Sequence, residues 1–568
     1  MSQPDLFNYT SGRWIYNETL RLAERQQFFN IALLNRIVAA SIGRPDQDVT
    51  CIRKLAEGGQ PIYATASEVA TMELVRLHGV PVPRILTYSA TDQNPVGSEY
   101  IIMEKAAGNE LGDLWYTMAE RQRLKMIFEI VKIEALLFSI QLPGYGSIYY
   151  EHELPPSMRR IGLQQAGGNG KFCVGPDALY KWWQKGRSSL STERGPFSET
   201  GYLLESVAKR ELEWLSRFGR PRFPFEPLRR ELYAYQKVHP DSHVKNPRDY
   251  LQVARHLSPE KECFLSRPIL RHPDLQPNNI LVSDSFEVVS LIDWQHSILP
   301  LFLQAGPPKY FQIYGDAVSE DLIKPQLPSD FDQLGENEQE AARINFQQRQ
   351  LHYYYFAATA KFNDDHFSAC TEDDVVLKQQ LFQHTGDPWE GDSVTLKADL
   401  IRVVQNWERL YASTVSVCPL HYSPAEIDGC LRLEEEQRLA DDDMEKSRNC
   451  LGVSGDGWVP TESGGVGKRD ADASIDDLVD VEKRQSWPGV PDYNIQMCRD
   501  ANVGRTVTVW GTSVNSLRVE NVAPKCMVLA TLFTEQGTPI LCGSACLDYV
   551  NLSAVDKQRL MVIVHNLL

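Results

Sequence analysis

The sequence predicts an α+β fold with two lobes, a small β-rich one and a larger, mostly helical one. Short apolar runs at residues 80–86 and 100–103 have the length and composition of paired strands. Apolar residues between 124 and 138 recur at helical spacing, which indicates a central and largely buried helix. Between residues 269 and 292, apolar runs alternate with polar turns, which predicts strand, loop, strand, turn and strand.

The segment from residue 269 to residue 293 also carries candidate catalytic side chains. Asp274 and Asn279 are five residues apart in the first loop, and Asp293 follows the last apolar run. Magnesium prefers a few hard oxygen ligands plus substrate phosphates, and Asn279 and Asp293 supply such oxygens. Asp274 would orient an attacking hydroxyl and accept its proton. We count His272 among the catalytic residues, as a brace for the loop rather than as a base.

This order of residues is that of the catalytic loop and metal-binding aspartate of kinase-like phosphotransferases. The chain resembles the aminoglycoside phosphotransferase family, and within it the fungal relatives of altered inheritance of mitochondria protein nine. The resemblance covers about residues 5–463. It implies Mg²⁺-dependent transfer of the ATP γ-phosphate to a hydroxyl of a small-molecule acceptor. Besides the catalytic segment, the matching stretches are residues 6–14, 54–59, 65–72, 99–105, 387–391 and 457–460.

The resemblance and the composition together divide the chain into five segments. An insertion at about 150–260 is expected to help form the acceptor side. Within it, residues 180–187 favour an amphipathic helix with buried tryptophans over a ligand-binding stretch. The segments are a mainly helical N-terminus (1–46), a small nucleotide-binding lobe (47–103), a helical catalytic lobe (104–465), a linker (466–485) and a cysteine-containing tail module (486–568).

The resemblance implies an adenine-binding hinge between the lobes. Met103, Glu104 and Lys105 follow the second strand of the small lobe, where the backbone of a kinase hinge would meet the base. A buried strand end would read the same way, so both interpretations stay open.

The phosphate-binding half of the site is incomplete in this sequence. Gly58 and Gly59 match the glycine-rich loop, although they could equally form only a turn. Glu68, on a predicted helix at 66–77, matches the glutamate that pairs with a basic residue on an intervening strand. The six residues after Gly59 lead directly into this helix, which leaves no room for two strands. We therefore expect poor ATP binding, and the alternatives are a weak kinase, a sequence that lacks an exon, or a catalytically impaired pseudokinase that acts as an interaction protein.

The composition excludes several other classes of function. A net charge of −17 argues against a nucleic-acid partner bound through its phosphates. No apolar run approaches the 18 residues of a transmembrane helix, and the N-terminus has no signal-peptide pattern. We expect an intracellular protein. The resemblance implies a mitochondrial location, and the cytoplasm is the alternative. No feature identifies the acceptor or a protein partner.

The tail differs in composition from the rest of the chain. It begins after a glycine-rich and then acidic linker, and residues 505–510 alternate as a strand does. Its four cysteines permit either a reduced module or a small disulfide-bonded one. A zinc site is not expected, because no second cysteine pair or histidine pair accompanies Cys542 and Cys546. The other seven of the 11 cysteines are scattered, which favours reduced thiols.

Overall fold

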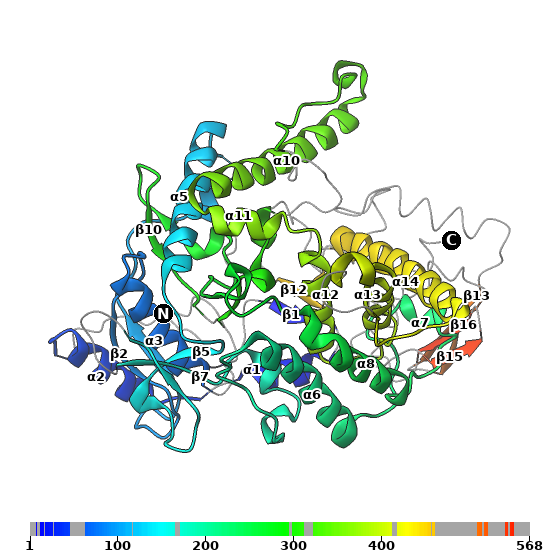
Figure 1. Cartoon of the computed structure of the whole chain (residues 1–568), viewed down its shortest axis with the longest axis horizontal. Helices are drawn as coiled ribbons and strands as arrows, with labels where there is room; N and C mark the ends of the chain where they lie inside the picture. Colours follow the sequence, from blue (N-terminus) through cyan, green and yellow to red (C-terminus); the bar gives the residue numbers. More distant parts are fainter. Residues whose placement is uncertain are drawn as a thin grey trace.

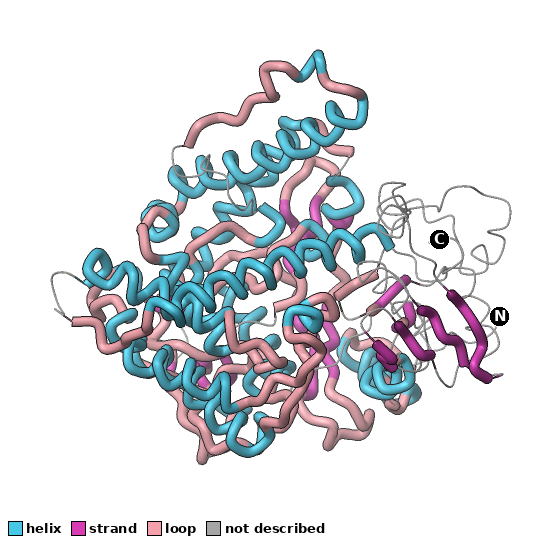
Figure 2. The backbone as a smooth tube through the Cα atoms, turned by 90° about the vertical axis from the view of Figure 1, so that its right-hand side faces the viewer, coloured by secondary structure: helices cyan, strands magenta, loops and turns pink. Residues whose placement is uncertain are grey.

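The protein is a helix-rich α+β molecule, seen in the computed structural model of Figure 1. The second view shows helices forming most of the body and strands confined to small sheets (Figure 2). The structure describes residue 7 and residues 12–15, 17–26, 28–45, 63–115, 117–164, 171–294, 298–311, 322–411, 417–451, 453–455 and 457–460, together with four strands of the tail.

The N-terminal segment contains one strand and two helices. Strand β1 (Gly12–Trp14) pairs antiparallel with β12 (Trp458–Pro460). The first and the last stretch of the chain that resemble the family therefore lie side by side. A Cβ atom on Gly12 would lie 2.3 Å from the indole nitrogen of Trp458, so this contact requires glycine. Helices α1 (Glu18–Arg25) and α2 (Ile31–Ser41) follow.

The small lobe is built on helix α3 (Ala64–Leu77) and a two-stranded antiparallel sheet of β2 (Ile85–Ser89) and β3 (Tyr100–Met103). The predicted helix and the second strand are confirmed. The first strand was predicted at 80–86, but β2 begins only at Ile85. Pro81 and Pro83 have no backbone N–H for a ladder, which explains the later start.

An insertion after the central helix covers α3. Its sheet has the order β5-β7-β6, from β5 (Ser147–Tyr150), β6 (Ile161–Gly162) and β7 (Phe172–Gly175), and α3 packs against β5. Residues from Ala64 to Met72 of α3 are all buried. The Tyr88 hydroxyl of β2 donates a hydrogen bond of 2.7 Å to Glu153, which fastens the insertion to the small lobe.

The catalytic segment forms the predicted hairpin. Strands β9 (Ile280–Val282) and β10 (Val288–Leu291) pair antiparallel, and β4 (Asn109–Glu110) adds to β9, which gives the order β10-β9-β4. Strand β8 (Pro268–Ile269) leads into the loop, but it pairs with β11 (Leu299–Pro300) rather than with the hairpin.

Helices make up most of the large lobe, and α10 lies along the predicted central helix α5 (Figure 1). Among the described residues, no helix is long and apolar enough to cross a membrane. The helices are α4 (Leu111–Trp115), α5 (Glu120–Ser139), α6 (Thr200–Phe218), α7 (Arg229–Leu232), α8 (Asp241–Leu257), α10 (Glu336–Phe362), α11 (Asp364–Cys370), α12 (Val375–Gly386), α13 (Thr395–Tyr411) and α14 (Pro424–Leu451).

The helix expected at 180–187 is wrong. Two short 3-10 turns, Tyr180–Trp182 and Arg187–Ser189, take its place. Lys185 and Gly186 between them adopt left-handed backbone angles, with φ of 50° and 84°, which a right-handed helix cannot include. One of the two tryptophans, Trp182, is buried as expected, at 1% exposure.

The tail forms a four-stranded antiparallel sheet of order β13-β14-β16-β15, from β13 (Thr508–Ser513), β14 (Ser516–Glu520), β15 (Ile540–Gly543) and β16 (Cys546–Tyr549). The strand predicted at 505–510 begins three residues late. Cys498 and Cys526 lie outside the described residues. In the described body, Cys173, Cys263, Cys370, Cys418 and Cys430 are free thiols, as predicted.

Candidate active site

The loop between β8 and β9 is anchored by buried apolar side chains. Leu270 is fully buried and Leu275 is 4% exposed, so that the polar residues between and after them are held at fixed positions. The loop ends in a 3-10 turn, Pro277–Asn279, which leads into β9. The local sequence therefore places the candidate catalytic residues of the loop within one short segment of the chain.

His272 lies inside the loop and holds it to the hairpin. It is 3% exposed, its Nδ1 accepts the Asp274 amide at 3.2 Å, and its Nε2 donates to the Ile292 carbonyl at 2.9 Å. Burial lowers the pKa of the imidazole to about 4, so it is neutral at physiological pH, with the proton on Nε2. This geometry fits a brace, because both ring nitrogens are occupied by the backbone.

Asp274 projects from the loop at an exposed position. Its Oδ2 accepts hydrogen bonds from the Gln276 side chain at 2.6 Å and from Nδ2 of Asn279 at 3.1 Å. The same amide nitrogen also donates to the Asp274 carbonyl at 2.8 Å. These bonds fix the orientation of the carboxylate while Oδ1 stays available for a substrate hydroxyl. They also direct the Asn279 amide nitrogen inward, which leaves its Oδ1 as the atom that could bind a metal.

Asp293 follows β10 at the mouth of the hairpin. Its φ of 68° is a left-handed value that few non-glycine residues adopt, and such angles are concentrated at functional sites. The residues beside it are fixed. The Ile292 amide donates to the Asn279 carbonyl at 3.1 Å, and fully buried Trp294 packs edge-on against His272 at 4.7 Å between ring centroids. Partial desolvation and then the charge of Asp274 raise the pKa of Asp293, so the two carboxylates share one site.

Glu68 of α3 reaches the same site from the small lobe. It is 8% exposed, and its carboxylate accepts a hydrogen bond from the Trp294 backbone amide. Burial, and then the charge of Asp293, raise the pKa of Glu68 to about 7. In the part of the chain that the structure describes, no basic side chain is among the groups that act on this carboxyl.

The proteins to which this chain is similar are consistent with a phosphotransferase site. The profile of the phosphotransferase enzyme family (APH) matches residues 46–299. Two subtelomeric hrmA-associated cluster proteins, from two strains of Aspergillus fumigatus, are 30% identical over 439 residues, which is 71% of this chain and 83% of theirs. The chain belongs to the phosphotransferase enzyme family.

More distant members extend the group. Altered inheritance of mitochondria protein 9 of Clavispora lusitaniae is 21% identical and covers 80% of this chain and 86% of its own length. Among solved structures, a Plasmodium vivax ethanolamine kinase matches 60% of this chain and 72% of its own at 12% identity, with a TM-score of 0.22. The predicted family resemblance is confirmed by these matches, and the predicted α+β fold class is confirmed by the helices and small sheets of the structure.

The donor set of this phosphotransferase fits a magnesium ion. The Asn279 amide oxygen and the Asp293 carboxylate are hard oxygen ligands, and a cation there would offset the repulsion among Asp293, Asp274 and Glu68. Among the described residues, no cluster of three or more histidine, cysteine, aspartate or glutamate side chains could hold a metal by itself. Such an ion would thus depend on waters and substrate phosphates for its other ligands, as is usual for magnesium.

The remaining predicted residues are those that the sequence assigns to nucleotide binding. Met103 ends β3, and Glu104 is tied to Arg84, whose carbonyl accepts the Glu104 amide at 2.9 Å and whose guanidinium pairs with the Glu104 carboxylate at 2.6 Å. Lys105 is exposed. No described contact joins these hinge residues to Asp274 or Asp293. Gly58 and Gly59 lie outside the described residues, as does the junction where two strands are expected to be missing.

Sequence reasoning missed a buried ionic network that supports the loop. Arg271 donates to Glu134 of α5 at 2.8 Å, to the Gln304 carbonyl at 2.7 Å and to the Tyr355 hydroxyl of α10 at 3.2 Å. Tyr355 in turn donates to Glu134 at 2.6 Å. Burial disfavours the Arg271 charge, but Glu134 and Tyr355 outweigh it and raise the pKa of the guanidinium. The charged Arg271 next to His272 was the only local signal for this network.

Proposed function

We propose that the chain transfers the γ-phosphoryl group of ATP to a hydroxyl group of a small molecule, with Mg²⁺ as cofactor. Membership in the phosphotransferase family supports the reaction class. The observation that carries the proposal is the convergence of Asp274, Asn279 and Asp293 at the mouth of one hairpin, with Asp274 fixed by two side-chain hydrogen bonds.

Each residue has a distinct role in the proposed reaction. Asp274 orients the acceptor hydroxyl and accepts its proton as the bond to phosphorus forms. Asn279 and Asp293 would hold the magnesium ion, which neutralises charge on the phosphates. Neutral His272 keeps the loop in register with the hairpin. Glu68 is close enough to Asp293 for their charges to interact, and it would organise the phosphate site if a basic partner were present.

A phosphorylation assay tests this proposal. Purified full-length protein is incubated with Mg-ATP and pools of small polyols, amino alcohols and sugars, and ADP release is measured. We expect turnover that falls by at least about 10²-fold in Asp274→Asn and in Asp293→Ala, since each removes a group that acts on the transferring phosphoryl. Turnover that is equal in wild type and both variants would refute the assignment of these residues.

The second candidate function is a pseudokinase that acts as an interaction protein. The observation that favours it is that, among the described residues, no basic side chain acts on Glu68 beside Asp293, whereas an active kinase site places a lysine or arginine there. Equilibrium titration with ATP in the presence of Mg²⁺ separates the candidates. Ordinary kinase affinity supports the enzyme. Sequencing of the transcript and gene around the codons for Gly59 and Tyr63 shows whether an exon is missing.

For location, we propose the mitochondrion, because relatives of this chain are named as mitochondrial proteins. The cytoplasm is the alternative. Fractionation of cells that express the tagged full-length chain decides between them, and recovery in the cytosolic fraction alone would contradict the mitochondrial assignment.

A further inference from the structure

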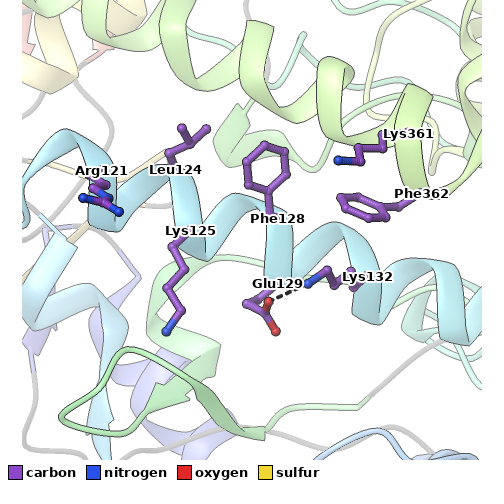
Figure 3. A pocket seen from close by; sticks show the side chains of 8 residues that line it. All are labelled: Arg121, Leu124, Lys125, Phe128, Glu129, Lys132, Lys361 and Phe362. Atoms are coloured by element: carbon purple, nitrogen blue, oxygen red, sulfur yellow. Dashed lines mark hydrogen bonds and ion pairs between the residues drawn. The ribbon is translucent and has the colours of Figure 1, made fainter.

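An open groove of about 340 Å³ runs between α5 and α10, outside the candidate active site. Figure 3 shows the two helices and the side chains that line the groove. Its apolar part is formed by Leu124, Phe128 and Phe362. The two phenylalanine rings meet edge-on, with centroids 6.0 Å apart and planes at 80°. The two rings therefore form an apolar surface between the helices and do not project outward from them.

The groove is strongly basic although the protein as a whole is acidic. Four exposed cations, Arg121, Lys125, Lys132 and Lys361, line it with one carboxylate, Glu129. The local net charge is therefore +3, on a chain whose net charge is −17. A cluster of positive charges on a protein whose overall charge is negative marks a surface that attracts a negatively charged partner.

Two of the cations are held by side chains of the groove, and a third is held by the β9–β10 hairpin. Lys132 donates to Glu129 at 2.9 Å, and the ammonium groups of Lys132 and Lys361 lie 5.4 and 5.3 Å from the centre of the Phe362 ring. Lys125 donates to the Ser285 carbonyl at the tip of the catalytic hairpin, at 2.9 Å. Each ammonium has three donors, so hydrogen bonds to a ligand remain possible at every one of these lysines.

The spacing of the cations defines the size of the ligand. Arg121 and Lys132 are eleven residues apart on α5, which corresponds to about 16 Å along a helix. About five residues of extended peptide span that distance. A membrane surface fits less well, because the aromatic rings lie between two helices and do not project.

We propose that the groove between α5 and α10 binds an acidic peptide segment of a partner protein. Carboxylates at the two ends of the segment pair with Arg121 and Lys125 on one side and with Lys132 and Lys361 on the other. An apolar side chain between them packs on Phe128 and Phe362. This is recognition of an acidic motif by a basic groove, with the aromatic pair as anchor. It does not depend on catalysis and applies to either candidate function.

The test is fluorescence anisotropy with the full-length protein and a fluorescein-labelled synthetic peptide, Glu-Asp-Phe-Glu-Asp. We expect binding to wild type that weakens with added salt and weakens at least about tenfold in the double variant Lys132→Glu, Lys361→Glu. The matched control is Lys261→Glu, Lys446→Glu, which changes net charge equally at exposed sites elsewhere and should bind within about twofold of wild type. Melting curves verify that both double variants fold.

Several results would overturn the proposal. One is absence of wild-type binding at about 200 μM peptide, and another is equal binding by the groove variant. Equal affinity for the amide peptide Gln-Asn-Phe-Gln-Asn would show that charge is not recognised. Groove-dependent binding of phosphatidylserine vesicles without peptide binding would assign the groove to a lipid surface. A gain in peptide affinity on substituting Asp476, Asp477 and Asp480 by asparagine would indicate that the acidic linker of the chain itself occupies the groove.

Discussion

The Glu68 carboxyl offers a quantitative test of the site geometry. The pKa of the Glu68 carboxyl is about 7 in the folded protein, whereas the pKa of an unperturbed glutamate is 4.5. The unfolded chain therefore releases this proton first, and the folded state loses relative stability as pH rises from about 4.5 to 7. The difference between the two pKa values corresponds to about 3 kcal/mol. Burial causes most of it, and the charge of Asp293 adds to it.

Replacing Glu68 by glutamine removes this penalty, because glutamine keeps an acceptor oxygen for the Trp294 amide but carries no charge. We predict that Glu68→Gln matches wild type in stability near pH 4 and exceeds it by up to about 3 kcal/mol at pH 8. The measurement is urea unfolding followed by tryptophan fluorescence across this pH range, with EDTA present so that no metal ion compensates the carboxylates.

Glu73 on the same helix is the matched control. Its hydrogen bond with Arg76 lowers the pKa of the Glu73 carboxyl. Its stabilising contribution is present above the unfolded pKa and is lost as pH falls, so Glu73→Gln should be less stable than wild type at pH 8. A Glu68→Gln variant that is less stable than wild type at pH 8, or whose advantage does not change with pH, would rule out an unfavourable buried charge at Glu68.

Two further substitutions test the support of the catalytic segment, each by urea unfolding. Glu134→Gln leaves the buried charge of Arg271 uncompensated and should cost about 3–5 kcal/mol; an apolar replacement of both residues should recover part of the loss, and no recovery would contradict the ionic account. Gly108 has a φ of 108° and a Cβ there would lie 2.6 Å from the Val282 carbonyl of β9. Gly108→Ala should therefore destabilise more than Gly97→Ala, where φ is also positive but no atom lies within 4 Å; an equal cost would refute the close contact.

The parts of the fold that could be predicted from the sequence are those set by local patterns. The β9–β10 hairpin follows from short apolar runs separated by a turn, and α5 follows from its helical spacing. The helix prediction failed at residues 180–187, where two residues with left-handed backbone angles interrupt an otherwise helical pattern. The start of β2 was also misplaced, although Pro81 and Pro83 contained the signal.

In the candidate site, too, the features set by local sequence patterns could be predicted and those set by tertiary packing could not. The grouping of Asp274, Asn279 and Asp293 could be predicted because one short segment of the sequence carries all three residues. The approach of Glu68 to Asp293 could be expected only from the family resemblance, since it joins two lobes. The Arg271 network could not be predicted, because Glu134 and Tyr355 lie 137 and 84 residues away and only tertiary packing brings them together.

We propose that the hairpin site transfers phosphoryl groups through Asp274, with a magnesium ion held at Asn279 and Asp293. The most direct measurement is Mg²⁺-dependent ADP release from ATP by the full-length wild type, beside Asp293→Ala, with the acceptor pools present. We predict turnover in wild type that EDTA abolishes and that falls by at least about 10²-fold in the variant. Undiminished turnover in Asp293→Ala, or no turnover in a wild type that binds Mg-ATP tightly, would contradict it.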